Sequence, residues 1–164
     1  MAIIVISSIL FALCCVLLGI VIKLFNYADD KLNNEKQMHE KAERYKAIVI
    51  QWLKLKNEGI NLSKYFSDRN YEKIAIYGYS ELGQMLEGEI ENTKINLTCF
   101  IDKNADKISV DKKIINPNEI EQYIKSIDAV VITPVVEFEK IKETLTIKML
   151  NKPIISLEDV VFDI

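Results

Sequence analysis

The chain has 164 residues, with 21 basic and 24 acidic side chains and a net charge of -3. This balance argues against nucleic-acid binding, because neutralising a phosphate backbone requires a basic surface. The length predicts one domain, and a single histidine without a Cys/His cluster leaves no zinc-site pattern. The three cysteines, Cys14, Cys15 and Cys99, are too few for a disulfide framework and are expected to be buried reduced thiols.

The N-terminal segment is strongly apolar, since Ala2 to Ile22 contains no charged residue. At about 1.5 Å per residue, a helix of this length just crosses a hydrocarbon core of about 30 Å. The segment lacks the basic start and the small-residue cleavage site of a signal peptide. Lys23, Lys31 and Lys36 follow it and none precedes it. We therefore expect residues 1–25 to anchor the protein in the cell membrane as a single pass, with the C-terminal domain in the cytoplasm.

Residues 26–58 form a charged helical linker in this interpretation. They carry a seam at heptad-like spacing, formed by Met38, Ala42, Tyr45, Val49 and Trp52. The seam either pairs with another copy or another membrane protein, or its C-terminal half packs on the following domain, and we favour the second. Gly59 is expected to stop the helix, and Asn61 to cap a short helix that buries Leu62, Tyr65 and Phe66.

Apolar strands alternate with helical patterns over residues 59–164, which predicts an α/β domain with a small Rossmann-like parallel sheet flanked by helices. The expected strands are Ile74–Tyr77, Ile95–Ile101, Lys112–Ile115, Ala129–Ile132 and Pro153–Ser156. The expected helices are Glu81–Glu91, Pro117–Ile124 and Val135–Ile147, with Leu157–Ile164 as a short tail. In the first of these, Leu82, Met85, Leu86 and Ile90 are expected on one face. The domain has room for one mononucleotide-binding half, which favours a nucleotide sugar or nucleoside diphosphate over NAD.

The first strand ends in a glycine-rich turn, Gly78-Tyr-Ser-Glu-Leu-Gly83. This is the G-x-G-x-x-G pattern with Ser80 in place of the middle glycine. Gly78 makes the turn, and Gly83 lets the following helix pack against the strand. The Ser80 hydroxyl could donate to a phosphate at the helix N-terminus, or it could cap the helix and do nothing more.

Two further residues are expected at the same edge of the sheet. Asp102 closes the second strand, where an acidic residue can accept from ribose hydroxyls or can simply form a turn with Lys103 and Asn104. Thr133 ends the strand expected beside the first one, at the topological switch point. Thr133 could contact a ligand there, or it could cap a helix that begins at Pro134, and we favour the cap.

No catalytic constellation is recognised. No tyrosine of the α/β domain is followed four residues later by lysine, as short-chain reductases require, and phosphate-loop and nucleophile-elbow motifs are absent from the sequence. His39 lies in the helical linker without a visible partner. We therefore expect a binding protein rather than an enzyme.

From about Trp52 onward the chain resembles a family of Rossmann-like domains of bacterial surface-polysaccharide proteins. The segments that carry this resemblance are IAIYGYSELG, FID, VVITP and PIISLEDV. The chain is similar to the N-terminal nucleotide-sugar-binding domain of bacillosamine-type sugar acetyltransferases and to the domain that follows the transmembrane helices of membrane-bound nucleotide-sugar dehydratases. The resemblance implies that Gly78, Gly83 and Asp102 lie where such domains hold a nucleotide sugar. The hexapeptide-repeat acetyltransferase domain is missing, so acyl transfer is not expected.

Together these features predict a membrane-anchored module that binds a nucleotide or nucleotide sugar and is accessory to cell-envelope polysaccharide biosynthesis. The alternative is a ligand-free interaction module. Its Met38–Trp52 seam would then dock a glycan-synthesis enzyme of the membrane or mediate self-association.

Overall fold

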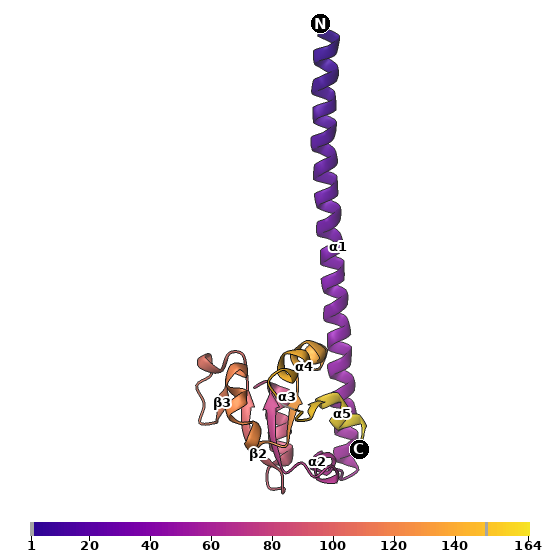
Figure 1. The fold of residues 1–164 in the computed structure, drawn as a ribbon. Coiled ribbons are helices and arrows are strands. Elements are labelled where there is room, and N and C mark those ends of the chain that lie inside the picture. The colour runs from indigo at the N-terminus through magenta and orange to yellow at the C-terminus, as the bar shows by residue number, and fades with distance from the viewer. Residues whose placement is uncertain (1, 150) are drawn as a thin grey trace. The chain divides into compact units, whose positions relative to one another are not determined.

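The computed structural model describes the backbone of residues 2–149 and 151–164 and the side chains of residues 17–149 and 151–164. Two units are distinguished, Met1–Glu43 and Arg44–Ile164. Helix α1 (Ala2–Asn57) contributes residues to both units (Figure 1). The second unit contains every other helix and strand of the described chain.

The predicted membrane span, Ala2–Ile22, falls mostly on residues whose side chains lie outside the described set. No helix within the described residues is long and apolar enough to cross a membrane. The anchor and its orientation therefore stay predictions.

The second unit is built on a five-stranded sheet. Its strands are β1 (Lys73–Tyr77), β2 (Asn96–Ile101), β3 (Ile114–Ile115), β4 (Ala129–Ile132) and β5 (Ile154–Ser156). All pairs are parallel and the order is β3-β2-β1-β4-β5, which confirms the predicted α/β class. The chain moves outward from β1 to β3 and then returns to place β4 on the other side of β1. The carboxyl ends of β1 and β4 therefore form the topological switch point.

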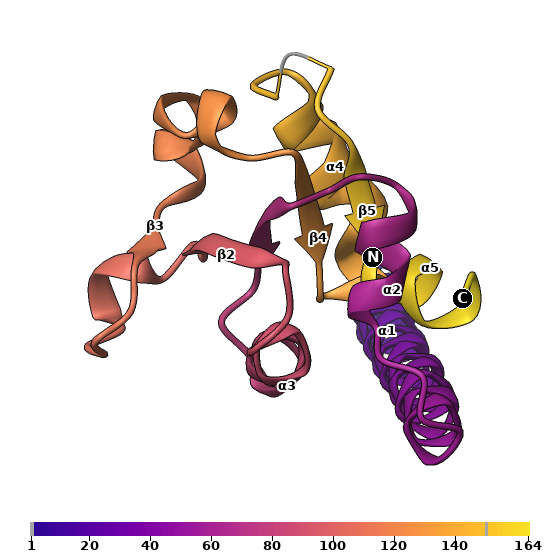
Figure 2. The same cartoon turned by 90° about the horizontal axis from the view of Figure 1, so that it is seen from below.

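Helices cover both faces of the sheet, as parallel sheets require (Figure 2). One face packs against α2 (Ser63–Asp68), α3 (Glu81–Ile90), α5 (Leu157–Phe162) and the C-terminal end of α1. The other face packs against α4 (Phe138–Thr146) and the 3₁₀ helices η2 (Pro117–Gln122) and η3 (Ile124–Ser126). Two more 3₁₀ turns, η1 (Ala105–Lys107) and η4 (Val135–Glu137), complete the described elements.

The C-terminal end of α1 belongs to the core of this unit. Ile48, Trp52 and Leu55 are buried there, and Tyr45 and Val49 pack against the same cluster. The intramolecular interpretation of the seam is therefore confirmed for its C-terminal half, Tyr45, Val49 and Trp52. Met38, in the first unit, is 69% exposed. Gly59 has a φ of 76° and closes α1 as predicted. Its amide bonds to the carbonyl of Lys56, and the next amide bonds to that of Leu55, which is a Schellman stop.

One local prediction is wrong and two are refined. Of the four residues expected on one face of α3, Leu82, Leu86 and Ile90 are buried whereas Met85 is 45% exposed. The segment after β5 is not a tail but helix α5, which Ser156 and Asp159 start with a capping box. The helix expected over Val135–Ile147 is confirmed as helical, but it consists of the 3₁₀ turn η4 followed by α4, which ends at Thr146.

We predict that Ile48→Ala destabilises the protein by about 2–5 kcal/mol, because it leaves a cavity in a core position of α1. Ile50→Ala, at a neighbouring position that is 44% exposed, should cost much less. Urea unfolding measures both, followed by the fluorescence of Trp52, which is the only tryptophan and is 3% exposed. Equal costs would show that this end of α1 does not belong to the core.

The thiol of Cys99 predicts a loss of stability at high pH. Burial raises the pKa of Cys99 from 9.0 to about 11 in the folded chain. Between these values the unfolded thiol ionises and the folded thiol does not, so the free energy of unfolding should fall as pH rises from about 9 to 11. Cys99→Ala should have a shallower slope over this range in the same urea assay. An identical slope would mean that other groups account for the whole effect.

Candidate functional site

The turn after β1 is glycine-dependent because three elements meet at it. Gly78 has a φ of 102°, and a Cβ there would lie 2.7 Å from Thr133 Oγ1. At Gly83, in the first turn of α3, a Cβ would lie 2.2 Å from the backbone oxygen of Gly78. The two glycines therefore have the roles expected of them: the first makes the turn, and the last lets α3 pack directly against it.

Ser80 occupies the N-cap position of α3, but its side chain makes no capping hydrogen bond. The interpretation of Ser80 as a side-chain cap is therefore wrong. Its exposed hydroxyl lies 3.5 Å from Thr133 Oγ1, at the long limit of a hydrogen bond. The first turn of α3 thus starts without a side-chain acceptor from its N-cap, which is the condition under which a helix N-terminus can receive an anion.

Asp102 fastens the glycine turn to the end of β2. One carboxylate oxygen accepts from the amide of Tyr79 at 3.0 Å, and the other accepts from the amide of Asn104 at 2.8 Å. The second bond is the turn that the sequence offered as one alternative, and the first crosses from β2 to the turn after β1. Each oxygen can still accept a further bond, so a ribose contact stays a prediction.

Thr133 fastens the end of β4 to the end of β1. Its side chain is fully buried, and its hydroxyl donates to the carbonyl of Tyr77 at 3.0 Å. It does not cap a helix, because the following 3₁₀ turn begins at Val135 with Pro134 as its N-cap residue. The favoured interpretation of Thr133 as a cap is therefore wrong. The hydrogen bond joins residues 56 positions apart, and only the pairing of β1 with β4 brings them together.

A small cavity of about 170 Å³ opens beside this turn, on the α4 side of the sheet. It is lined by Tyr77, Gly78, Asp102, Lys103, Asn104, Pro134, Glu137 and Ile141. A neighbouring cavity of about 200 Å³ shares four of these residues, Tyr77, Lys103, Glu137 and Ile141, and extends along α4. The structure thus brings Gly78 and Asp102 together in the wall of the smaller cavity, which Ser80 and Thr133 do not line.

The charges at this edge are mixed. Burial raises the pKa of Tyr77, and the carboxylates of Asp102 and Glu137 raise it further, so the phenol stays neutral at physiological pH and can donate. Among the described residues that line the smaller cavity, Lys103 is positive whereas Asp102 and Glu137 are negative. The described residues contain no group of three or more side chains able to hold a metal ion. The edge can therefore offer hydroxyl, ammonium and amide donors to a ligand, and carboxylates to its hydroxyl groups.

Several residues at this edge were not singled out by the sequence. Tyr77, Lys103 and Glu137 line both cavities, and Glu137 lies three residues beyond the switch-point proline. Tyr79 contributes the amide that Asp102 accepts, and its ring packs edge-on against Phe100 at 4.9 Å. The sequence places these residues near predicted strand ends. It does not show where α4 packs, and the cavity depends on that packing.

A parallel sheet of this order, with a glycine turn and a helix N-terminus at its switch point, defines a Rossmann-type α/β domain. The chain belongs to the family described as C2185-like, N-terminal, whose model matches residues 70–155. The matched span includes all five predicted site residues, Gly78, Ser80, Gly83, Asp102 and Thr133. No curated protein matches the chain.

Two glycines of α3 should respond oppositely to alanine. Gly83→Ala should destabilise the protein by about 1–3 kcal/mol or more, because its Cβ would meet the backbone oxygen of Gly78. Gly88→Ala, five residues on, should stabilise it by up to about 1 kcal/mol, because no atom lies within 4 Å of the new Cβ. Urea unfolding followed by Trp52 fluorescence measures both. A tolerated Gly83→Ala would contradict the close packing of α3 on the turn.

Proposed function

We propose that this protein binds a nucleotide, of the nucleotide-sugar class, at the carboxyl edge of its sheet between the turn after β1 and the end of β4. The observation that carries the proposal is Ser80, an exposed hydroxyl at the N-cap of α3 that makes no capping bond. A phosphate placed there would accept from the first-turn amides and from the hydroxyl, and the helix dipole would favour its charge.

The neighbouring groups suit the rest of such a ligand. Asp102 lies at the end of β2 with spare acceptor capacity for ribose hydroxyls. The cavities beside Tyr77 extend away from the turn along α4 and offer apolar contact together with donors and acceptors at the rim. The sugar class comes from the resemblance to nucleotide-sugar-binding domains of polysaccharide proteins. With the predicted membrane anchor, it supports an accessory role in cell-envelope polysaccharide biosynthesis on the cytoplasmic side.

The rival is a ligand-free interaction module. Two observations favour it: Asp102 and Thr133 already bond to the backbone, and Glu81 begins α3 beside the proposed phosphate position. Neither observation accounts for the exposed Ser80 hydroxyl, which makes no capping bond. The two functions therefore differ in whether any nucleotide binds at this edge.

The test is a calorimetric titration of the full-length chain, in detergent micelles, with a panel of nucleotide sugars, nucleoside diphosphates and NAD. We expect saturable binding of a nucleotide sugar, weakened at least about tenfold by Ser80→Asp, whose carboxylate would occupy the first-turn amides and repel phosphate. Asp102 is less suitable for this test, because replacing it removes two backbone bonds whether or not a ligand binds.

Ser109→Asp is the matched control, because it adds the same charge at an exposed loop position. It should leave the dissociation constant unchanged. Absence of binding by every nucleotide at millimolar concentration would establish the rival, and equal effects of the two variants would move the ligand away from α3.

A further inference from the structure

The two small cavities beside the glycine turn share polar side chains that come from different parts of the chain. Tyr77 at the end of β1, Lys103 in the loop after β2 and Glu137 in η4 line both cavities. The strand order places β1 between β2 and β4, which brings these three segments to one edge of the sheet. Their convergence therefore depends on the fold and not on nearness in the sequence.

Lys103 and Glu137 are exposed, and neither forms an ion pair among the described residues. Asp102, by contrast, already accepts from two backbone amides. Burial raises the pKa of Tyr77, and the carboxylates of Asp102 and Glu137 raise it further, so the Glu137 charge lies close to the Tyr77 phenol. The ammonium, the carboxylate and the phenol can therefore face one ligand together.

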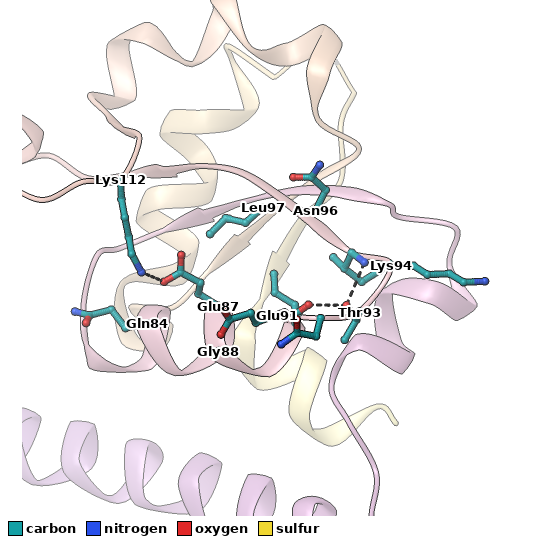
Figure 3. A pocket seen from close by; sticks show the side chains of 12 residues that line it. Gln84, Glu87, Gly88, Glu91, Thr93, Lys94, Asn96, Leu97 and Lys112 are labelled. Atoms are coloured by element: carbon teal, nitrogen blue, oxygen red, sulfur yellow. Dashed lines mark hydrogen bonds and ion pairs between the residues drawn. The ribbon is translucent and has the colours of Figure 1, made fainter.

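The hollow between α3 and the start of β2, of about 690 Å³, is different in both position and bonding. It runs along α3 toward the amino end of β2 and so leads away from the carboxyl edge. Glu87 pairs with Lys112 across it, as Figure 3 shows. The Thr93 hydroxyl donates there to the carbonyl of Ile90 and accepts from the amide of Ile95. This hollow is therefore not a candidate for a ligand held at the turn.

The charges of the two cavities favour hydroxyl groups over phosphate. Among the described residues that line them, Asp102 and Glu137 are carboxylates, and Lys103 and Lys140 are ammonium groups. A balanced set of this kind does not compensate the several negative charges of a diphosphate. It suits a neutral ring with several hydroxyls, because carboxylates accept from hydroxyls while ammonium groups and the Tyr77 phenol donate to them.

The two carboxylates stand on opposite sides of the end of β1, since Asp102 follows β2 and Glu137 lies beyond β4. The larger cavity extends along α4 and is lined by Glu137 but not by Asp102. A ribose at Asp102 would therefore leave the side of the edge near Glu137 to a second ring.

The glycine turn joins these cavities to the proposed phosphate position. Gly78 lines the smaller cavity, and Ser80 is two residues further along the chain, a span of at most about 7 Å. The Ser80 hydroxyl also lies 3.5 Å from that of Thr133, and the next residue, Pro134, lines the same cavity. A ligand with its phosphate at α3 can therefore place a group bonded to that phosphate in the cavities.

On the basis of the proposed function, we infer that the sugar of the nucleotide sugar binds in the cavities lined by Tyr77, Lys103 and Glu137, whereas the diphosphate stays at the N-terminus of α3. Glu137 accepts from the sugar hydroxyls, and Lys103 and the phenol of Tyr77 donate to them. A nucleotide sugar should then bind more tightly than the same nucleoside diphosphate without its sugar, because only the sugar reaches these groups.

Calorimetric titration of the full-length chain in detergent micelles tests this assignment with three matched pairs: UDP and UDP-glucose, GDP and GDP-mannose, and dTDP and dTDP-glucose. In a pair that binds, the nucleotide sugar should bind about tenfold more tightly. Glu137→Ala should remove most of this preference and leave binding of the nucleoside diphosphate unchanged. Glu143→Ala, at an exposed position of α4 that lines neither cavity, is the matched control and should bind both members like the natural chain.

Tyr77→Phe gives a second readout, because it keeps the ring and removes only the hydroxyl. It should weaken binding of the nucleotide sugar by about threefold to tenfold and leave the nucleoside diphosphate unchanged. Ser80→Asp, in contrast, should weaken both members of a pair alike.

The outcomes separate this assignment from the proposed function. Equal weakening of both members by Glu137→Ala would place the ribose or the base beside Glu137, and tighter binding of the nucleoside diphosphate by that variant would place a phosphate there. Either result overturns the assignment of the sugar and leaves nucleotide binding intact, as do members of a pair that bind equally well to the natural chain. Absence of binding by every member overturns both.

Discussion

The crowding around Gly78 is the constraint on which the rest of the α/β unit depends. The backbone oxygen of Gly78 approaches α3 so closely that Gly83 cannot carry a side chain, and Gly78 itself leaves no room for one beside Thr133. The helix, the first strand and the fourth strand are therefore fixed relative to one another by direct contact. Because α3 starts here, the same contact decides where the N-terminus of the helix lies.

This constraint explains why the polar residues at the carboxyl edge bond mainly to the backbone. Thr133 joins β4 to β1, and Asp102 joins β2 to the turn, so three neighbouring strand ends are cross-linked by side chains. An edge held in this way is organised before any ligand arrives, which lowers the ordering cost of binding. The residue left out of these bonds is Ser80, which is why the proposed ligand contact rests on it rather than on Asp102.

The parts of this fold that depend on local pattern could be predicted from the sequence. Ala129–Ile132 has the same bounds in the prediction and in the structure, because four apolar residues end at a polar residue and a proline. The stop at Gly59 followed from the left-handed conformation that glycine tolerates. Helical spacing placed Met85 on one face with Leu82 and Leu86, but spacing alone does not show that Met85 is 45% exposed while the other two are buried. The capping box at Ser156 was present in the sequence, but so short a helix has almost no periodicity to support it.

The roles of Thr133 and Asp102 could not be read from the sequence for a different reason. Their partners are backbone groups of Tyr77 and Tyr79. Because such groups are common to residues of every type, the sequence does not mark which of them will be the partner. Predicting these bonds requires the strand order, which brings the ends of β2 and β4 to either side of β1. Sequence reasoning offered a ligand contact or a cap for Thr133 and a ligand contact or a local turn for Asp102, and only the local turn to Asn104 is among the bonds observed.

The C-terminal end of α3 is held by an ion pair and a hydrogen bond rather than by close packing of the backbone. Glu89 is 6% exposed in the last turn of the helix, where a negative charge opposes the helix dipole. Lys56 of α1 pairs with its carboxylate at 2.9 Å, and Asn61 donates to its backbone carbonyl at 2.8 Å. A buried carboxylate without such partners would be costly, so this end of α3 stays attached to α1 and to the segment after it. Helix α3 is thus held at the turn by the absence of side chains and at its other end by a charge pair.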